Sequence, residues 1–151
     1  MKVFVFSSYN ITNIWASIGA CQWAVSKRQA DNKALQTRAK GIPIGSFGIF
    51  YCNPKGMGVF TTPFIIYSKP DPERIVKDIW PEEWKLPFKI VPLGSPKKQI
   101  KAHKLTSLLP SLKGKQEKWN ELLYVSGGTA FAPSKISEMD WEILFSELSG
   151  V

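Results

Sequence analysis

The 151 residues, 44% hydrophobic and 13% aromatic, are enough for one globular domain and too apolar for a disordered chain. No apolar run is long enough to span a membrane, the first residues do not form a secretion signal, and two cysteines with one histidine exclude a disulfide framework and a zinc site. The net charge of +8 favours a polyanionic partner, and we expect a cytoplasmic protein that needs no cofactor or metal.

The first third of the chain alternates between strand and helix patterns. Residues 2–6, KVFVF, alternate like a strand, and apolar residues then recur at helical spacing from Ile11, with Asn10 as a possible cap. Residues 21–25, CQWAV, predict a second strand. Residues 27–40 predict a polar helix that ends at Gly41.

The remaining two thirds predict a hairpin, further strands and late helices. The hairpin covers residues 45–67 and turns at the sequence NPKG, where proline and glycine favour a tight turn. The other elements predicted are a helix at 71–80, strands at 87–93 and 99–105, and helices at 115–125 and 137–148, the last with a capping pair of Ser137 and Asp140. Together they predict one α+β domain over residues 1–151, a small curved barrel of mostly antiparallel strands flanked by helices.

Positive charge gathers in one segment. Seven lysines and a single acid, Glu117, lie between Lys97 and Lys118. One interpretation is a solvated basic face, and the other is a surface that binds a polyanion. Four lysines are candidates to hold a nucleic-acid backbone: Lys97, Lys98, Lys101 and Lys104.

The chain offers little for catalysis. It lacks the motifs of serine hydrolases, phosphate-binding loops and zinc proteases. The possible acids and bases are His103 and the adjacent pair Glu82 and Glu83, and neighbouring loop residues seldom point the same way. We therefore predict a binding domain with no catalytic residues, and keep a small-molecule enzyme or toxin-like domain as an alternative.

The six tryptophans fall into two groups. Trp119 and Trp141 lie at apolar positions of the late helices and are expected in the core, whereas Trp15 is ambiguous. Three others lie at strand ends or in the turn DIWPEEWKLPF: Trp23, Trp80 and Trp84. Flanked by polar residues, these three predict an aromatic box for a flat ring, with Trp23 a partly solvated wall of it.

These same segments resemble a known group of domains. The stretch FVFSSYNITNIWASIGACQW is similar to the opening of YTH domains, and WAVS, GIFYCNPKGMGVF and IWPEEWKLPFKIVPL are similar also to EVE domains. Both belong to the PUA-like superfamily, whose members read modified nucleic acids. The resemblance covers about residues 3–106. It extends to the N-terminal specificity domain of archaeal McrBC-type, modification-dependent restriction enzymes.

The resemblance assigns roles to particular residues. It implies that Trp23 is one wall of a cage around a methylated adenine, that Trp80 and Trp84 supply another wall and a lid, and that Asn13 bonds a ring nitrogen. It also implies that the carbonyl of Ala24 accepts the exocyclic N–H, with Tyr9 and Ser8 at the same pocket. The chemistry agrees, because a carboxamide offers both a donor and an acceptor to an adenine edge.

The chain departs from the YTH pattern at its phosphate-binding positions. Ser7 stands where a lysine is common, and SGGTAF replaces a turn whose arginine grips phosphate. The lysines of 97–118 are expected to take over that task.

The resulting expectation is a monomeric domain that flips a modified base, such as N6-methyladenine, into an aromatic pocket. We expect DNA rather than RNA as its partner, no membrane, and a downstream motor domain that makes it the specificity module of a restriction NTPase or nuclease. The alternative is a PUA-like reader of modified RNA.

Overall fold

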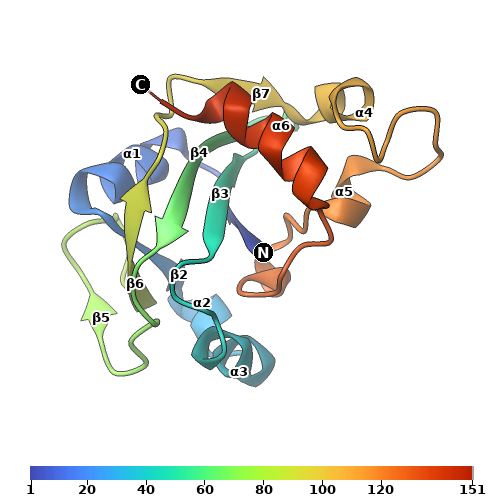
Figure 1. Ribbon diagram of the computed structural model, residues 1–151. Coiled ribbons are helices and arrows are strands. Elements are labelled where there is room, and N and C mark those ends of the chain that lie inside the picture. The colour runs from blue at the N-terminus through green and yellow to red at the C-terminus, as the bar shows by residue number, and fades with distance from the viewer. Residues whose placement is uncertain (151) are drawn as a thin grey trace.

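A computed structural model describes residues 1–150 (Figure 1). Within these residues no helix combines the length and the apolar character needed to cross a lipid bilayer. The strands are β1 (Val3–Ser8), β2 (Gln22–Ser26), β3 (Phe47–Cys52), β4 (Val59–Ile66), β5 (Ile75–Val76), β6 (Trp84–Pro92) and β7 (Gln99–Lys101). The helices are α1 (Ile11–Ala20), α2 (Lys27–Ala30), α3 (Lys33–Lys40), α4 (Leu105–Leu108), α5 (Trp119–Leu122) and α6 (Glu138–Leu148), with 3-10 turns η1 (Ala102–Lys104) and η2 (Gly127–Thr129).

All of these strands join one mixed sheet. Five of them follow the order β1-β3-β4-β6-β2, while β5 adds to β6 and β7 adds to β4. Strands β1 and β3 are parallel, whereas the other pairs, including β5 with β6 and β7 with β4, are antiparallel. The prediction of mostly antiparallel strands is therefore confirmed. The register shifts within the β2–β6 and β3–β4 pairs, and such irregularities bend strands and help a sheet to curl.

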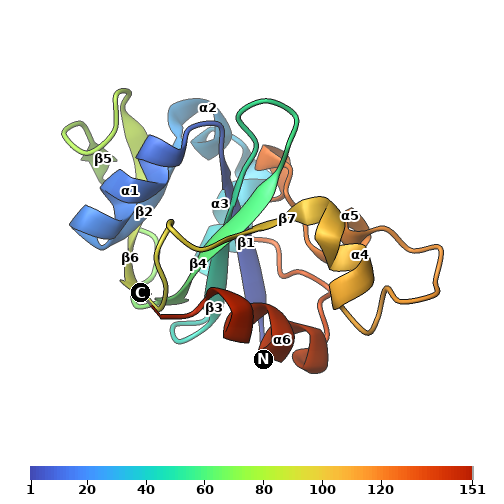
Figure 2. The same cartoon turned by 90° about the horizontal axis from the view of Figure 1, so that it is seen from above.

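Both faces of the sheet are buried because its strands alternate between two apolar clusters. Phe4, Phe6 and Phe50 point into the concave cluster, whereas Ile49 and Tyr51 point into the convex one. Helix α6 covers the convex face together with α4 and α5, while α1 and α2 lie on the other side, as Figure 2 shows from above. The domain is thus an α+β half-barrel with flanking helices, as the sequence predicts.

Packing inside the half-barrel explains why position 48 of β3 is a glycine. A Cβ atom at Gly48 would lie 2.2 Å from the ring of Phe64 on the neighbouring strand, closer than real side-chain contacts allow. The Phe64 ring is fully buried and lies 4.7 Å from that of Phe50. A glycine at position 48 therefore lets the aromatic core reach the backbone of β3.

Four predicted elements differ in the structure. The helix predicted at 71–80 is wrong, because the Asp71 carboxylate accepts a hydrogen bond from the Glu73 N–H, and Ile75 and Val76 pair with β6 instead. The strand predicted at 99–105 ends at Lys101, because its partner β4 begins at Val59, opposite that residue.

The two other differences concern helices. The helix predicted at 27–40 is interrupted, since Asn32 accepts a hydrogen bond from the Leu35 N–H and starts a new helix, α3. The helix predicted at 115–125 is only the short α5, flanked by extended backbone at Lys118 and Leu123. Helix α6 confirms its prediction, including the cap in which Ser137 Oγ accepts from the Asp140 N–H at 3.1 Å.

Candidate nucleic-acid interface

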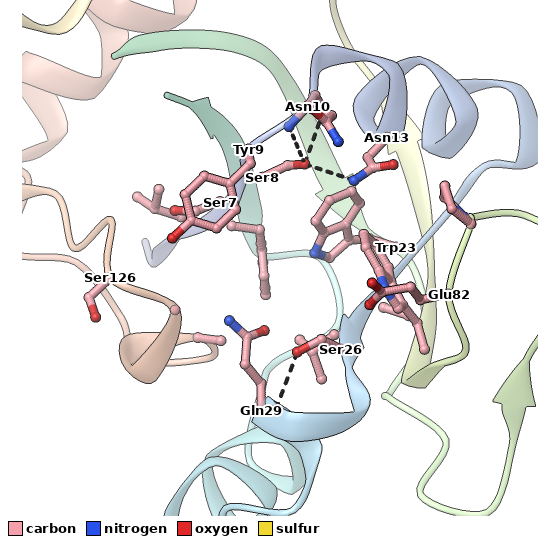
Figure 3. Close-up of a pocket in the computed structure, with 18 residues that line it drawn as sticks. Ser7, Ser8, Tyr9, Asn10, Asn13, Trp23, Ser26, Gln29, Glu82 and Ser126 are labelled. Atoms are coloured by element: carbon pink, nitrogen blue, oxygen red, sulfur yellow. Dashed lines mark hydrogen bonds between the residues drawn. The ribbon is translucent and has the colours of Figure 1, made fainter. Parts of the chain in front are cut away.

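One cavity gathers most of the predicted site residues. It lies where the end of β1 and the start of α1 face β2, α2, the segment before β6 and the η2 turn (Figure 3). Its volume is about 350 Å³, at the lower end of the range for small-ligand sites. Six of the predicted base-binding residues line it: Ser8, Tyr9, Asn13, Trp23, Ala24 and Trp84.

Trp23 and Trp84 form the aromatic wall of the cavity. Their rings meet edge to face, with centroids 5.1 Å apart, and Trp23 also packs 4.7 Å from Phe50 of the concave core. Trp23 is only 2% exposed, so the expectation that it is a partly solvated wall is wrong. Trp23 belongs to the concave core cluster and also lines the cavity.

Trp80 lies behind this wall and does not line the cavity. Its ring stacks on Trp84 with centroids 4.3 Å apart and an angle of 18° between the planes, so no other ring fits between the two. It is buried, and its Nε1–H donates to the carbonyl oxygen of Asn13 at 3.1 Å. Trp80 therefore supports Trp84 and fixes the backbone that carries Asn13.

A polar edge stands beside the aromatic wall. Asn13 Nδ2 donates to Ser8 Oγ at 3.2 Å, and Ser8 Oγ donates in turn to the Asn10 carbonyl oxygen at 3.0 Å. Asn10, predicted as a helix cap, begins α1 without a side-chain cap bond. The Ser8 hydroxyl orients the Asn13 carboxamide at the cavity, and Figure 3 shows both beside Trp23.

Ala24 and Tyr9 lie at opposite depths of the cavity. Ala24 is fully buried in β2, where the pairing with β6 shifts register, so that it stands across from Leu86 and Pro87. Proline has no N–H with which to bind the Ala24 carbonyl. Tyr9, directly after β1, is 83% exposed and also lines the cavity.

The far wall comes from residues that were not among the predicted site residues. Gln29 of α2 and Ser126 and Gly127 near η2 all line the cavity. Arg38 of α3 holds the η2 segment in place, because its guanidinium donates to the carbonyl oxygens of Gly128 at 2.7 Å and Ala130 at 3.0 Å. The replaced turn SGGTAF was the one indication that this segment matters.

The four lysines predicted to hold a backbone lie on another part of the surface. All are exposed, on β7, on η1 or just before β7, and Lys98 Nζ donates to the Ser149 carbonyl oxygen at 2.9 Å. Among the lining residues of the cavity none is one of these lysines. The cationic residues next to the cavity wall in sequence are instead Lys27 and Arg28 of α2, between Ser26 and Gln29.

The possible catalytic residues do not come together. Glu82 lines the cavity, whereas its neighbour Glu83 points to Lys77, with Nζ and Oε1 3.9 Å apart. His103 is exposed in η1. Across residues 1–150 no group of three His, Cys, Asp or Glu side chains is placed to hold a metal ion.

Comparison with known proteins places the fold. No protein-family model matches the sequence, and no curated protein matches it either. The structure resembles the Toxoplasma CPSF4 YTH domain in its apo form, with a TM-score of 0.63 and 18% identity over 99% of this chain and 88% of that one.

Two further likenesses are to domains crystallised with RNA. The same Toxoplasma domain in complex with a 7-mer N6-methyladenosine-modified RNA gives a TM-score of 0.51 and 23% identity over 69% of this chain and 66% of that one. The YTH domain of the MRB1 protein of Zygosaccharomyces rouxii, in complex with N6-methyladenosine RNA, gives a TM-score of 0.53. The identity is 18% over 78% of this chain and 76% of that one. At these identities the likeness shows the fold, which is the α+β half-barrel of YTH domains.

Proposed function

We propose that this domain binds N6-methyladenine in RNA by taking the base into the cavity lined by Trp23 and Trp84. The observation that carries the proposal is the cavity itself, in which an aromatic wall stands beside an oriented carboxamide. Stacking on aromatic side chains contributes about 1–3 kcal/mol per base. The carboxamide of Asn13 complements a ring nitrogen, and the carbonyl of Ala24 accepts the one N–H that methylation leaves.

RNA is the better candidate partner. The sequence led to an expectation of DNA, through the resemblance to restriction enzymes. The similar Toxoplasma and Zygosaccharomyces domains were crystallised with modified RNA, which supports the RNA alternative. An unpaired base in a single strand also costs less to extrude than one inside a duplex. The McrBC resemblance and a downstream motor domain stay predictions from sequence.

Phosphate binding is proposed to be separate from base recognition. We assign it to Lys97, Lys98, Lys101 and Lys104, which are exposed. Because these lysines lie outside the cavity, they contribute affinity for any strand and no preference for the modified base.

A four-way binding measurement tests this function. RNA and DNA oligonucleotides of one sequence, each with and without a single N6-methyladenine, are titrated with the domain and followed by fluorescence anisotropy. We expect methylated RNA to bind about tenfold or more tightly than unmethylated RNA, since one methyl group in an apolar pocket is worth roughly 10- to 200-fold. Equal affinity for the two RNAs contradicts the proposal, and a preference for methylated DNA restores the original expectation.

A further inference from the structure

Gln29 occupies a distinct place on the cavity wall. It lies in α2, the short helix that follows β2, and its backbone N–H donates to Ser26 Oγ at 3.3 Å, which caps this helix. Its half-buried side chain extends into the cavity from the side opposite Asn13 and Ser8, as Figure 3 shows. Three carboxamide residues thus line the cavity, Asn10 and Asn13 at the start of α1 and Gln29 across from them, and of these only Asn13 was expected.

Gly127 leaves the space in which the Gln29 carboxamide lies. A Cβ atom added to Gly127 would come within 2.2 Å of Gln29 Nε2, so the carboxamide rests directly on the glycine backbone. That backbone is itself held, because Arg38 binds the carbonyl oxygens of Gly128 and Ala130. Among residues 1–150 the carboxamide of Gln29 has no hydrogen-bond partner, so its donor and acceptor are free for a ligand in the cavity.

The placement of polar groups on opposite sides of the cavity suits the polar atoms of an adenine. Asn13 and Gln29 extend into the cavity from opposite sides, and Ala24 also lines it. Around the base, N1 is followed by the exocyclic N6 and then by N7, which is an acceptor. If Asn13 reads the ring nitrogen N1 and the Ala24 carbonyl accepts from N6, the next atom along that edge is N7.

We infer that Gln29 is a specificity-determining residue that donates a hydrogen bond from its carboxamide to N7 of the bound adenine. The inference rests on the proposed function and extends it, because it adds a contact to the edge of the base that Asn13 does not reach. A purine is then preferred over a pyrimidine, which has no atom equivalent to N7.

The test removes the acceptor from the ligand and the donor from the protein. One RNA carries N6-methyladenosine, and the other carries N6-methyl-7-deazaadenosine, in which a C–H group replaces N7. We expect the unaltered domain to bind the deaza RNA about fivefold to tenfold more weakly, which is the usual worth of one hydrogen bond. Gln29→Ala, which lacks the N–H donor, is expected to bind the two RNAs equally and weakly. The isosteric Gln29→Glu places a carboxylate against N7, so it is expected to show no deaza penalty and to bind the deaza RNA at least as well.

Two further variants make the result specific. Gly127→Ala places a methyl group where the carboxamide lies and is expected to act like Gln29→Ala. Gln116→Ala, at an exposed glutamine of a loop, is expected to keep the full deaza penalty. Thermal unfolding of each variant verifies that it is folded.

The outcomes separate this inference from the proposed function. A deaza penalty that persists in folded Gln29→Glu, or no penalty in the unaltered domain, overturns the role of Gln29 while the preference for methylated RNA stands. If the unaltered domain does not distinguish methylated from unmethylated RNA, the proposed function fails, and the inference fails with it.

Discussion

At the scale of single residues, Trp23 combines two tasks that usually belong to different side chains. It packs against Phe50 in the concave core and lines the cavity, and it is 2% exposed. Removing it therefore damages the fold and the cavity together. Trp84 is half-buried and touches the same space, which makes it the cleaner probe of base stacking.

Alanine at three tryptophans is expected to separate stability from recognition. Trp84→Ala should abolish the preference for methylated RNA, a loss of about 1–3 kcal/mol, and destabilise the domain least. Trp23→Ala should abolish the preference and cost about 3–5 kcal/mol of unfolding free energy, as for a core tryptophan. Trp141→Ala, on the buried face of α6, should cost as much and leave the preference of the folded fraction unchanged.

Urea unfolding and fluorescence anisotropy with the two RNAs measure these effects. If folded Trp84→Ala prefers methylated over unmethylated RNA as strongly as the unaltered domain does, the assignment of the aromatic wall is wrong.

The sequence carried enough local information to predict one side of the cavity. Ser8, Asn13 and Trp23 lie within the one stretch that resembles the opening of YTH domains, and this resemblance implied a shared site. Gln29 and Gly127 could not be paired in advance, because their contact depends on bringing together segments about 100 residues apart. Trp80 was misplaced for a related reason, since spacing does not say which of two stacked rings faces the cavity.

At the scale of elements, the cavity and the lysine-bearing segment belong to different parts of the sheet. The cavity lies at β1 and β2, whereas β7 with its lysines pairs with the first residues of β4. Short elements were also the hardest to predict. The acids and apolar residues of 71–80 fit a helix pattern, and only the pairing of Ile75 and Val76 with β6 decides for a strand.

Salt dependence of RNA binding tests the role of the lysine segment. Replacing Lys97, Lys101 and Lys104 together by alanine should reduce the slope of log affinity against log salt by about 2, since each phosphate contact on a single strand contributes roughly 0.7. The preference for the methylated base should not change. The matched control replaces Lys27 and Arg28, the cations beside the cavity wall. If the slope of log affinity against log salt falls only in this control, the phosphate contacts lie at α2 and not at the lysine segment.

At the scale of the whole molecule, one sheet separates two apolar clusters, and neighbouring residues of β3 point into different ones. Tyr51 packs with Phe60 and Trp119 on the convex side, while Cys52 belongs to the concave core. Burial raises the pKa of the Tyr51 hydroxyl, and nearby Cys52 raises it further. Burial likewise raises the pKa of the Cys52 thiol.

These raised pKa values predict a loss of stability in alkaline solution. In the unfolded chain the two groups have ordinary pKa values, near 8.5 for cysteine and 10 for tyrosine. The folded chain holds both protons to higher pH. Their contribution is therefore complete below about pH 8 and declines above it. Urea unfolding at pH 7 and pH 10 should show a smaller decline for the double variant Tyr51→Phe and Cys52→Ala. An identical decline in both proteins excludes these groups as its cause.

The outer edge of β1 has a consequence for how the chain is made. Phe4 bridges to Pro133, and the Ser134 N–H donates to the Val3 carbonyl oxygen at 2.9 Å, so the first strand is completed by residues near the end. A ribosome that adds about 5–20 residues per second needs roughly 6 to 26 s to make the intervening stretch. Throughout that interval the nascent β1 has an open edge, and the growing chain must remain unaggregated until Pro133 and Ser134 have been made.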